Sequence, residues 1–224
     1  MKTIILVLVA CFVVLIGNAQ EPGTEFRVLA YGDGLFEGVF FEDASEGEPK
    51  RVYLEFLPNQ KSRKYSVVEA KGTIEFFQEV EEEGALVQIE VGRAEFEQES
   101  EVLLLVFFET SDFEESQEYE VLTLDESDRV WRAGCVRFLN LSGAELLGQI
   151  GEVSLQLPHD ASEVVCFEEG NRDARRIQLR VRWEGSERVV YSSRFLPDPN
   201  HPKLMVIKPP LEERSLKVRV ETLW

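Results

Sequence analysis

Two histidines, His159 and His201, are the only side chains in the sequence with an ordinary pKa suited to general-base chemistry near neutral pH. His159 lies in LPHDAS, with Asp160 beside it and Ser162 three positions on, and these are the residue types of a nucleophilic triad. No nucleophile-elbow or oxyanion-hole motif surrounds them, and both histidines lie in loop-like stretches. The sequence therefore favours solvated loop histidines, and we expect no catalytic residue and no enzymatic activity.

Acidic side chains are abundant, with 42 Asp and Glu, so a pair of carboxylates could in principle catalyse hydrolysis. A glycosidase pair needs carboxyl groups about 5 to 10 Å apart across a cleft, and abundance does not provide that geometry. Calcium binding is a second possibility, but no acidic loop follows the D-x-[DN]-x-[DN]-G spacing. The loop residues considered are Asp43, Glu46, Glu48, Asp125 and Asp128. We expect no metal and no cofactor.

Two of the three cysteines, Cys135 and Cys166, belong to the second half of the chain. An oxidising compartment permits a disulfide, which requires Cα atoms within about 7 Å of each other. Buried free thiols are the alternative, and the sequence leaves both possibilities open. The triplet NLS at 140–142 fits an N-glycosylation acceptor at the end of a predicted strand, although such triplets are frequent by chance.

Residues 1–19 have the layout of a secretory signal peptide. Lys2 precedes an apolar run from 4 to 16, and small residues at 17 and 19 precede a cut before Gln20. The run is shorter than the roughly 20 residues of a membrane span. LVAC at 8–11 resembles a lipobox, but apolar residues continue after Cys11, which argues against lipidation. We expect an exported protein, periplasmic or extracellular, that does not span the membrane once processed.

The charge of −18 is unevenly distributed along the chain. Residues 21–130 contain 29 acidic and 9 basic side chains, a net charge of −20, whereas residues 131–224 contain 13 and 14, a net charge of +1. This asymmetry indicates two units with different surfaces, an acidic one at 20–130 and a second at 131–224. The overall charge argues against nucleic acid as a partner.

The segment GCVRFLNLSGAELLGQIGE at 134–152 resembles EFRVLAYGDGLFEGVFFE at 25–42. Aligned without gaps, Arg27 matches Arg137, Leu29 matches Leu139 and Gly38 matches Gly148. Further segments correspond in the same order: 53–67 with 153–167, 102–108 with 203–208, and 118–124 with 215–223. We interpret the chain as two copies of one strand-rich unit.

The segments have the period of β-strands. RIQLRVRW at 176–183 alternates strictly, with Ile177, Leu179, Val181 and Trp183 on one face, as in a half-buried antiparallel strand. VLLLVFF at 102–108 does not alternate, which predicts a central strand covered on both faces. EVEEEG at 79–84 predicts a charged hairpin loop. Short strands separated by frequent turn signals predict an all-β protein of two antiparallel sandwiches, divided near 125–129.

The strand RFLNLSG and the later LQLP resemble secreted bacterial β-sandwich repeats of unassigned function. The whole pattern is similar to uncharacterised exported two-domain proteins of verrucomicrobial-type bacteria. This resemblance implies immunoglobulin-like modules and supplies no catalytic residue. The first copy departs from it, with RVLAYGDG where the motif has Asn and Ser.

A row of arginines offers a docking surface on the second unit. We expect the outward side chains of 176–182 to be joined by those of the next strand; the set is Arg176, Arg180, Arg182, Arg188 and Arg194. The row is interpreted either as charge that keeps a surface strand soluble or as electrostatic docking, between the units or between molecules.

The sequence thus predicts an exported, non-catalytic binding or scaffolding protein of the periplasm or cell envelope. It would act through its sandwich surfaces on a protein or glycan partner, and self-association is possible. The alternatives are an extracytoplasmic hydrolase with a carboxylate site and an outer-membrane β-barrel, for which most of the predicted strands are too short.

Overall fold

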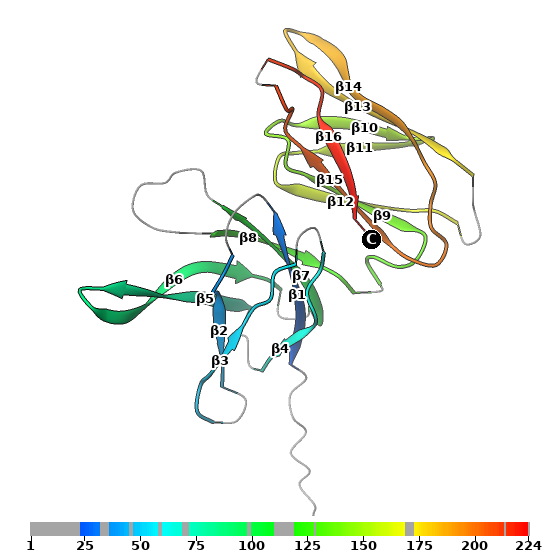
Figure 1. The fold of residues 1–224 in the computed structure, drawn as a ribbon. Coiled ribbons are helices and arrows are strands. Elements are labelled where there is room, and N and C mark those ends of the chain that lie inside the picture. Colours follow the sequence, from blue (N-terminus) through cyan, green and yellow to red (C-terminus); the bar gives the residue numbers. More distant parts are fainter. Residues whose placement is uncertain are drawn as a thin grey trace, which may run out of the picture.

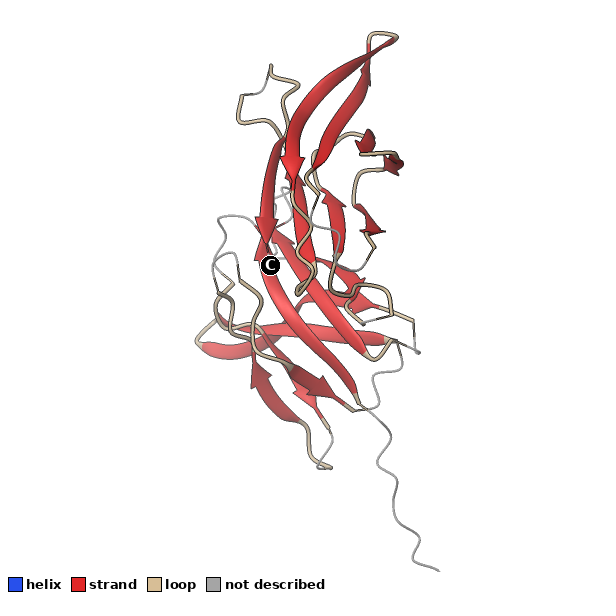
Figure 2. Cartoon of the chain, turned by 90° about the vertical axis from the view of Figure 1, so that its right-hand side faces the viewer, coloured by secondary structure: helices blue, strands red, loops and turns tan. Residues whose placement is uncertain are grey.

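The computed structural model describes residues 23–31, 36–44, 47–57, 60–68, 72–97, 100–109, 119–127, 129–168, 173–212 and 214–223. The predicted signal peptide and Cys11 lie outside these residues. Every regular element described is a β-strand (Figure 2). The strands are β1 (Thr24–Tyr31), β2 (Phe40–Asp43), β3 (Lys50–Tyr53), β4 (Tyr65–Val67), β5 (Thr73–Glu82), β6 (Ala85–Glu95), β7 (Val102–Glu109), β8 (Tyr119–Asp125), β9 (Cys135–Asn140), β10 (Leu146–Ile150), β11 (Val153–Leu157), β12 (Ala161–Cys166), β13 (Arg175–Trp183), β14 (Ser186–Phe195), β15 (Lys203–Lys208) and β16 (Arg219–Leu223).

The strands form four sheets of four, two from each unit. In the first unit the inner sheet has the order β4-β1-β7-β8 and the outer sheet the order β3-β2-β5-β6. In the second unit the inner sheet is β12-β9-β15-β16 and the outer sheet is β11-β10-β13-β14. The prediction of an all-β protein with two sandwiches is confirmed. No helix in the described part of the chain is long and apolar enough to cross a membrane.

The two units share one topology. Each inner sheet is centred on a parallel pair, β1 with β7 and β9 with β15, and its other pairs are antiparallel. The strand order differs from the immunoglobulin one, in which strands A-B-E-D form one sheet and C-F-G the other. The first strand of each unit instead lies between the fourth and the seventh. The sandwich architecture that the resemblance implied is present, with a strand order of its own.

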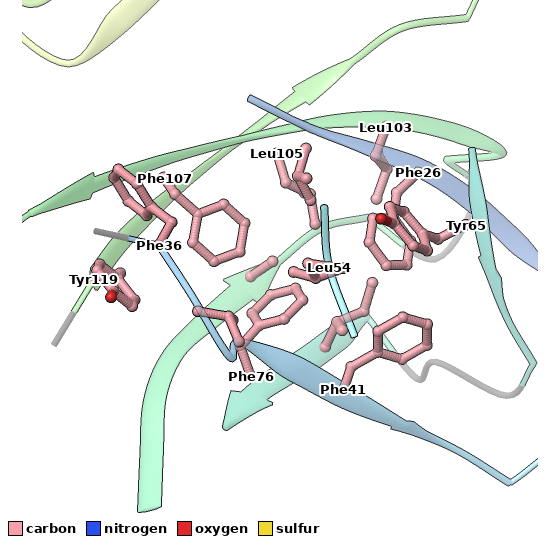
Figure 3. Packing of buried hydrophobic residues seen from close by; sticks show 14 of the residues in the cluster. Phe26, Phe36, Phe41, Leu54, Tyr65, Phe76, Leu103, Leu105, Phe107 and Tyr119 are labelled. Carbon is pink, nitrogen blue, oxygen red and sulfur yellow. The ribbon is translucent and has the colours of Figure 1, made fainter. Parts of the chain in front are cut away.

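A core of aromatic residues fills the sandwich of the first unit (Figure 3). Phe76 and Phe107 meet edge to face with ring centroids 4.9 Å apart, and Phe26 lies 5.2 Å from Phe41. Such arrangements add about 0.5 to 1.5 kcal/mol per pair to the burial of the rings. Phe77 is partly buried and faces outward, because it lies between Phe76 and Gln78, which point inward.

The two inner sheets pack against each other across an apolar layer that we call the seam. In β7, Leu103, Leu105 and Phe107 point into the first sandwich, while Leu104 and Val106 point into the seam. In β15, Met205 and Ile207 point into the second sandwich, while Leu204 and Val206 point into the seam. The protein is therefore a stack of four sheets with three apolar layers between them (Figure 1). Burial on both faces explains why VLLLVFF does not alternate.

Equivalent residues of the two units meet in the seam. Four pairs of positions related by the strand registers lie there together: Leu29 and Leu139, Leu104 and Leu204, Val106 and Val206, and Leu124 and Leu223. The registers reproduce the sequence match of Leu29 with Leu139. They do not reproduce that of Gly38 with Gly148, because Gly38 lies in the turn before β2 at φ 71°, whereas Gly148 lies within β10. Phe41 occupies the position of Gly148 in the first unit, by the pairings of β2 and β10.

Two long hairpins end in the same turn. β5 and β6 are joined by Glu83-Gly84, and β13 and β14 by Glu184-Gly185, with positive φ at all four residues. Positive φ at both central residues is the requirement of a type I′ hairpin turn. A hairpin is present at EVEEEG, but its loop is limited to Glu83 and Gly84, because 79–82 belong to β5 and are paired with β6. Trp183 adjoins the second turn and lies on the same side of β13 as Ile177, Leu179 and Val181, as predicted, although its side chain is 49% exposed.

We expect Leu204→Ala to lower the free energy of unfolding by about 2 to 5 kcal/mol, because Leu204 is fully buried in the seam and its truncation leaves a cavity. Leu211→Ala is the matched control, since Leu211 is 80% exposed and its truncation should change stability by less than about 0.5 kcal/mol. Urea denaturation followed by tryptophan fluorescence measures both. Because the seam joins the units, wild type should unfold in one transition; two well-separated transitions would contradict a shared core.

Candidate functional site

The outer sheet of the second unit carries most of the predicted docking residues on its solvent face. We call this surface the arginine face; its charged residues are Arg176, Arg180, Arg182, Arg194 and Glu187. Ile177 and Leu179 on the same strand are buried in the sandwich, so the alternation of β13 fixes the direction of these arginines. The sheet contributes polar neighbours, among them Gln149, Gln156 and Ser192.

Arg188 does not belong to the arginine face. A bulge between the pairs Leu179–Tyr191 and Arg180–Val189 leaves Val190 as an extra residue in β14. Arg188 therefore pairs with Val181, on the side of the sheet that faces the core, where it extends past the end of the sandwich into solvent. The prediction that Arg188 joins the row is wrong, because a bulge shifts the alternation by one residue and is not visible in the sequence pattern.

The arginines of this face differ in their local partners. The Arg180 guanidinium donates to the Gln178 amide oxygen at 2.6 and 3.1 Å and lies 3.6 Å from a Glu187 carboxylate oxygen. Arg176 lies directly opposite Arg194 in the register of β13 and β14. No ion pair between described residues involves either of them. Two like charges directly opposite each other in a sheet are destabilising, so this pair has a cost that folding alone does not explain.

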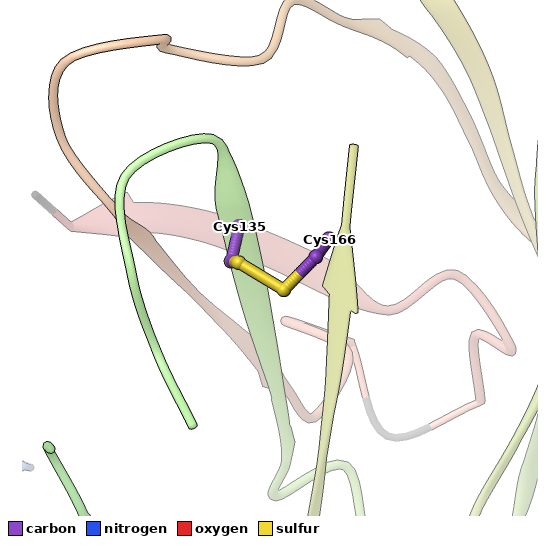
Figure 4. Close-up of a disulfide and its surroundings, with 2 residues drawn as sticks. All are labelled: Cys135 and Cys166. Atoms are coloured by element: carbon purple, nitrogen blue, oxygen red, sulfur yellow. A yellow bond between two sulfur atoms is a disulfide. The ribbon is translucent and has the colours of Figure 1, made fainter. Parts of the chain in front are cut away.

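Cys135 and Cys166 form a disulfide between neighbouring strands, β9 and β12 (Figure 4). They are direct partners in the antiparallel register, with Cα atoms 4.0 Å apart. Glu25 and Ser66 occupy the corresponding paired positions of the first unit. The disulfide that the sequence left open is therefore present, and it links the two strands beside the seam, where Cys135 is buried.

The histidine loop holds no assembled triad. The Nδ1 atom of His159 accepts a hydrogen bond from the Gly143 N–H at 3.2 Å, and Nε2 lies 3.2 Å from an Asp160 carboxylate oxygen. Both ring nitrogens are thus engaged within the loop, and Ser162 lies in β12 opposite Leu139. His201 is exposed, with Nδ1 3.6 Å from Asp198. This geometry favours the solvated-loop interpretation of both histidines.

Asn140 of the NLS triplet is fully buried, and its amide organises the surrounding loops. The amide nitrogen donates to the carbonyl oxygens of Ala144, Leu157 and Pro158 at 2.8 to 3.0 Å. The amide oxygen accepts hydrogen bonds from the Ser142 N–H and hydroxyl. A folded chain does not offer this nitrogen for glycosylation, so the asparagine serves the fold.

The acidic loops do not converge in the part of the chain that the structure describes. No group of three or more His, Cys, Asp or Glu side chains there could hold a metal ion. Asp125 accepts a hydrogen bond from the Ser127 N–H at 2.8 Å and so closes a local turn. Glu46 and Asp128, two of the predicted calcium ligands, lie outside the described residues.

A pocket of about 850 Å³, which was not predicted from the sequence, opens at one end of the seam. Both units and the segment between them line it: Arg27, Gln60, Lys61, Lys64, Glu101, Val102, Glu126, Ser127, Arg129, Trp131, His201 and Pro202. Four of these are lysine or arginine against two glutamates, so the pocket favours anionic groups although the first unit is acidic. The sequence feature that relates to the pocket is the match of Arg27 with Arg137, because both arginines lie on the seam side of their strands.

Trp131 fixes the joint between the units. Its side chain is 1% exposed, with the Lys61 ammonium 4.4 Å and the Arg137 guanidinium 5.2 Å from the centre of the ring. Lys61 forms an ion pair with Glu126, and Arg137 donates to the Asp125 carbonyl oxygen at 2.6 Å. Burial lowers the pKa of Arg137, opposed by Asp125 and Glu126, and the group remains a cation. The polar stretch at 125–129, predicted as a divide, is therefore anchored to both units.

Tyr31 lies across the seam from the last strands of the second unit. The Lys208 ammonium lies 4.8 Å from the centre of its ring, and Phe108 packs against it at 5.2 Å. Burial raises the pKa of Tyr31 to about 12; Arg219 opposes this shift and Glu221 adds to it. The phenol thus reports on contact between the two units.

No protein-family model matches the chain, and no curated protein matches it either.

Replacing both Cys135 and Cys166 with alanine should lower the free energy of unfolding by about 3 to 4 kcal/mol, because the disulfide closes a loop with a sequence separation of 31. Urea unfolding of the double variant and of reduced and oxidised wild type measures the change. Reduction should have no effect on the double variant, which serves as the control. Two titratable thiols in the native, unreduced protein would show that the bridge is absent.

We expect the phenol of Tyr31 to ionise near pH 12. The folded state keeps this proton while the unfolded state loses it near pH 10, so the contribution of Tyr31 to stability is present below pH 10 and falls between pH 10 and 12. Titration by ultraviolet absorbance should show a late phase that Tyr31→Phe removes and Tyr53→Phe, at a 49% exposed ring, retains. A late phase that persists in Tyr31→Phe would contradict the assignment.

Proposed function

We propose that the protein is an exported, non-catalytic binding or scaffolding protein of the cell envelope, and that the arginine face binds an acidic protein surface. The observation that carries this proposal is the pair Arg176 and Arg194, directly opposite each other on an exposed sheet and in no ion pair with a described residue. Export follows from the sequence layout of residues 1–19.

The chemistry of the arginine face fits carboxylates. A guanidinium presents a planar set of donors that matches a carboxylate in two parallel hydrogen bonds. A partner carboxylate between Arg176 and Arg194 would offset the repulsion that the isolated sheet bears. The repulsion between the two arginines, which destabilises the isolated sheet, would then favour binding of the partner carboxylate.

The architecture supports binding through a preformed surface. β13 pairs on both sides, with β10 and β14, and its apolar face is buried in the second sandwich. The arginines therefore project from a packed sheet instead of a loop. A surface that is ordered before binding loses less conformational entropy when a partner docks.

A photo-crosslinking residue at Ser192, on the arginine face, should capture a protein partner in the native cell envelope. Arg176→Glu/Arg194→Glu should reduce the crosslinked product by at least about tenfold, because charge reversal at a docking surface costs several kcal/mol. Immunoblotting and mass spectrometry of the product measure the loss. A diffuse product removed by glycosidases would mean that the partner is a glycan.

The matched controls are on the same strand. Arg188→Glu changes an exposed arginine on the other side of the sheet, and a crosslinker at Ser193, which pairs with Ile177, points away from the arginine face. Arg188→Glu should leave the product unchanged, and Ser193 should give little of it. Equal yields from wild type and the Arg176/Arg194 variant would contradict the proposed function.

A further inference from the structure

The outer sheet of the first unit presents an acidic counterpart to the arginine face. We call it the glutamate face; its charged residues are Glu42, Glu75, Glu79, Glu81, Glu90, Glu95, Arg51 and Arg93. Arg51 pairs with Glu79, and Arg93 with Glu75 and Glu90. Among the described residues, Glu81 and Glu95 form no ion pair. The face therefore keeps an excess of negative charge after its own pairs are formed.

Charge is reversed at corresponding positions of the two faces. The bulges of β6 and β14 align the hairpins, because each leaves one extra valine, Val91 or Val190. By these registers Glu79 corresponds to Arg182, and Glu95 corresponds to Arg194. One strand framework thus carries carboxylates in one unit and guanidinium groups in the other.

Both faces also have exposed apolar groups. Tyr53 on the glutamate face is 49% exposed and Leu86 is 71% exposed, while Val189 on the arginine face is 53% exposed. Apolar and aromatic groups within a polar surround are typical of the core and rim of a protein interface. The exposed apolar groups and the charges of the two faces are therefore both suited to packing one face on the other.

We propose that a second copy of this chain is the partner, with the arginine face of one copy packed on the glutamate face of the next. This inference rests on the proposed function of the arginine face and names its occupant. The acidic surface required is one that every copy carries: within the described part of the chain, Glu81 and Glu95 on this face form no ion pair, and neither do Arg176 and Arg194 on the arginine face.

The position of the faces determines the form of the assembly. They belong to the first and last sheets of the four-layer stack, so the two copies meet through different surfaces (Figure 1). A contact between different surfaces is heterologous and leaves one free face at each end of every assembly. Copies add head to tail, and each addition places one outer sheet on another.

Sedimentation velocity of the mature full-length chain tests the proposal. Wild type at low ionic strength should form a concentration-dependent series of oligomers that salt dissociates, because the contact is electrostatic. Arg176→Glu/Arg194→Glu changes the net charge of the arginine face from positive to negative and leaves the glutamate face intact, whereas Glu81→Arg/Glu95→Arg removes the net negative charge of the glutamate face and leaves the arginine face intact. Each variant alone should lose at least about tenfold in association constant. An equimolar mixture should regain assembly, because the copies can then alternate.

Arg188→Glu and Glu82→Arg are the controls, since both change exposed charges on the core-facing side of the same hairpins. Both should assemble as wild type does. A wild-type chain that stays monomeric at low salt, or a mixture that does not regain assembly, overturns the inference. If Ser192 still crosslinks to a different protein in an Arg176/Arg194-dependent way, the proposed function stands and only the choice of partner fails.

Discussion

The structure depends on the packing of two inner sheets against each other across the seam. A strand with both faces buried favours an uninterrupted run of apolar side chains, and the central strands β7 and β15 have such runs. The seam places both sandwiches in one body and limits the exposed sheet faces to the two outer ones. The charges of those outer faces therefore determine which surfaces the protein can offer to others.

The segment between the units is part of this packing. Trp131 lies between a lysine of the first unit and an arginine of the second, and Glu126 and Asp125 hold those two cations. Relative motion of the units would disturb the contacts that this one buried ring makes with cations of both units. The pocket beside Trp131 is consequently a fixed feature of the joint, with walls from both units.

Local patterns in the sequence were sufficient to predict the strands, but they were insufficient to predict how the strands pair and pack. The run VLLLVFF predicted a strand buried on both faces, because burial favours an apolar side chain at each position whatever the partner strand is. The β-bulge that turns Arg188 away was not predictable, because a bulge depends on the partner strand. Pairing of Cys135 with Cys166 likewise required the register of β9 and β12. The glutamate face was not predicted, because its carboxylates are distributed over three strands, β2, β5 and β6, whose arrangement in one sheet depends on strand pairing.

The seam has a consequence for the origin of the chain. Leucines and valines at matching positions of both units meet there, so each unit contributes the same patch of its inner sheet. A patch that packs against its own counterpart is the interface of a two-fold symmetric homodimer. A single eight-stranded ancestor could bury this patch only by pairing with another molecule like itself. Joining two such ancestors end to end would have made that pairing permanent and freed the outer faces to diverge in charge.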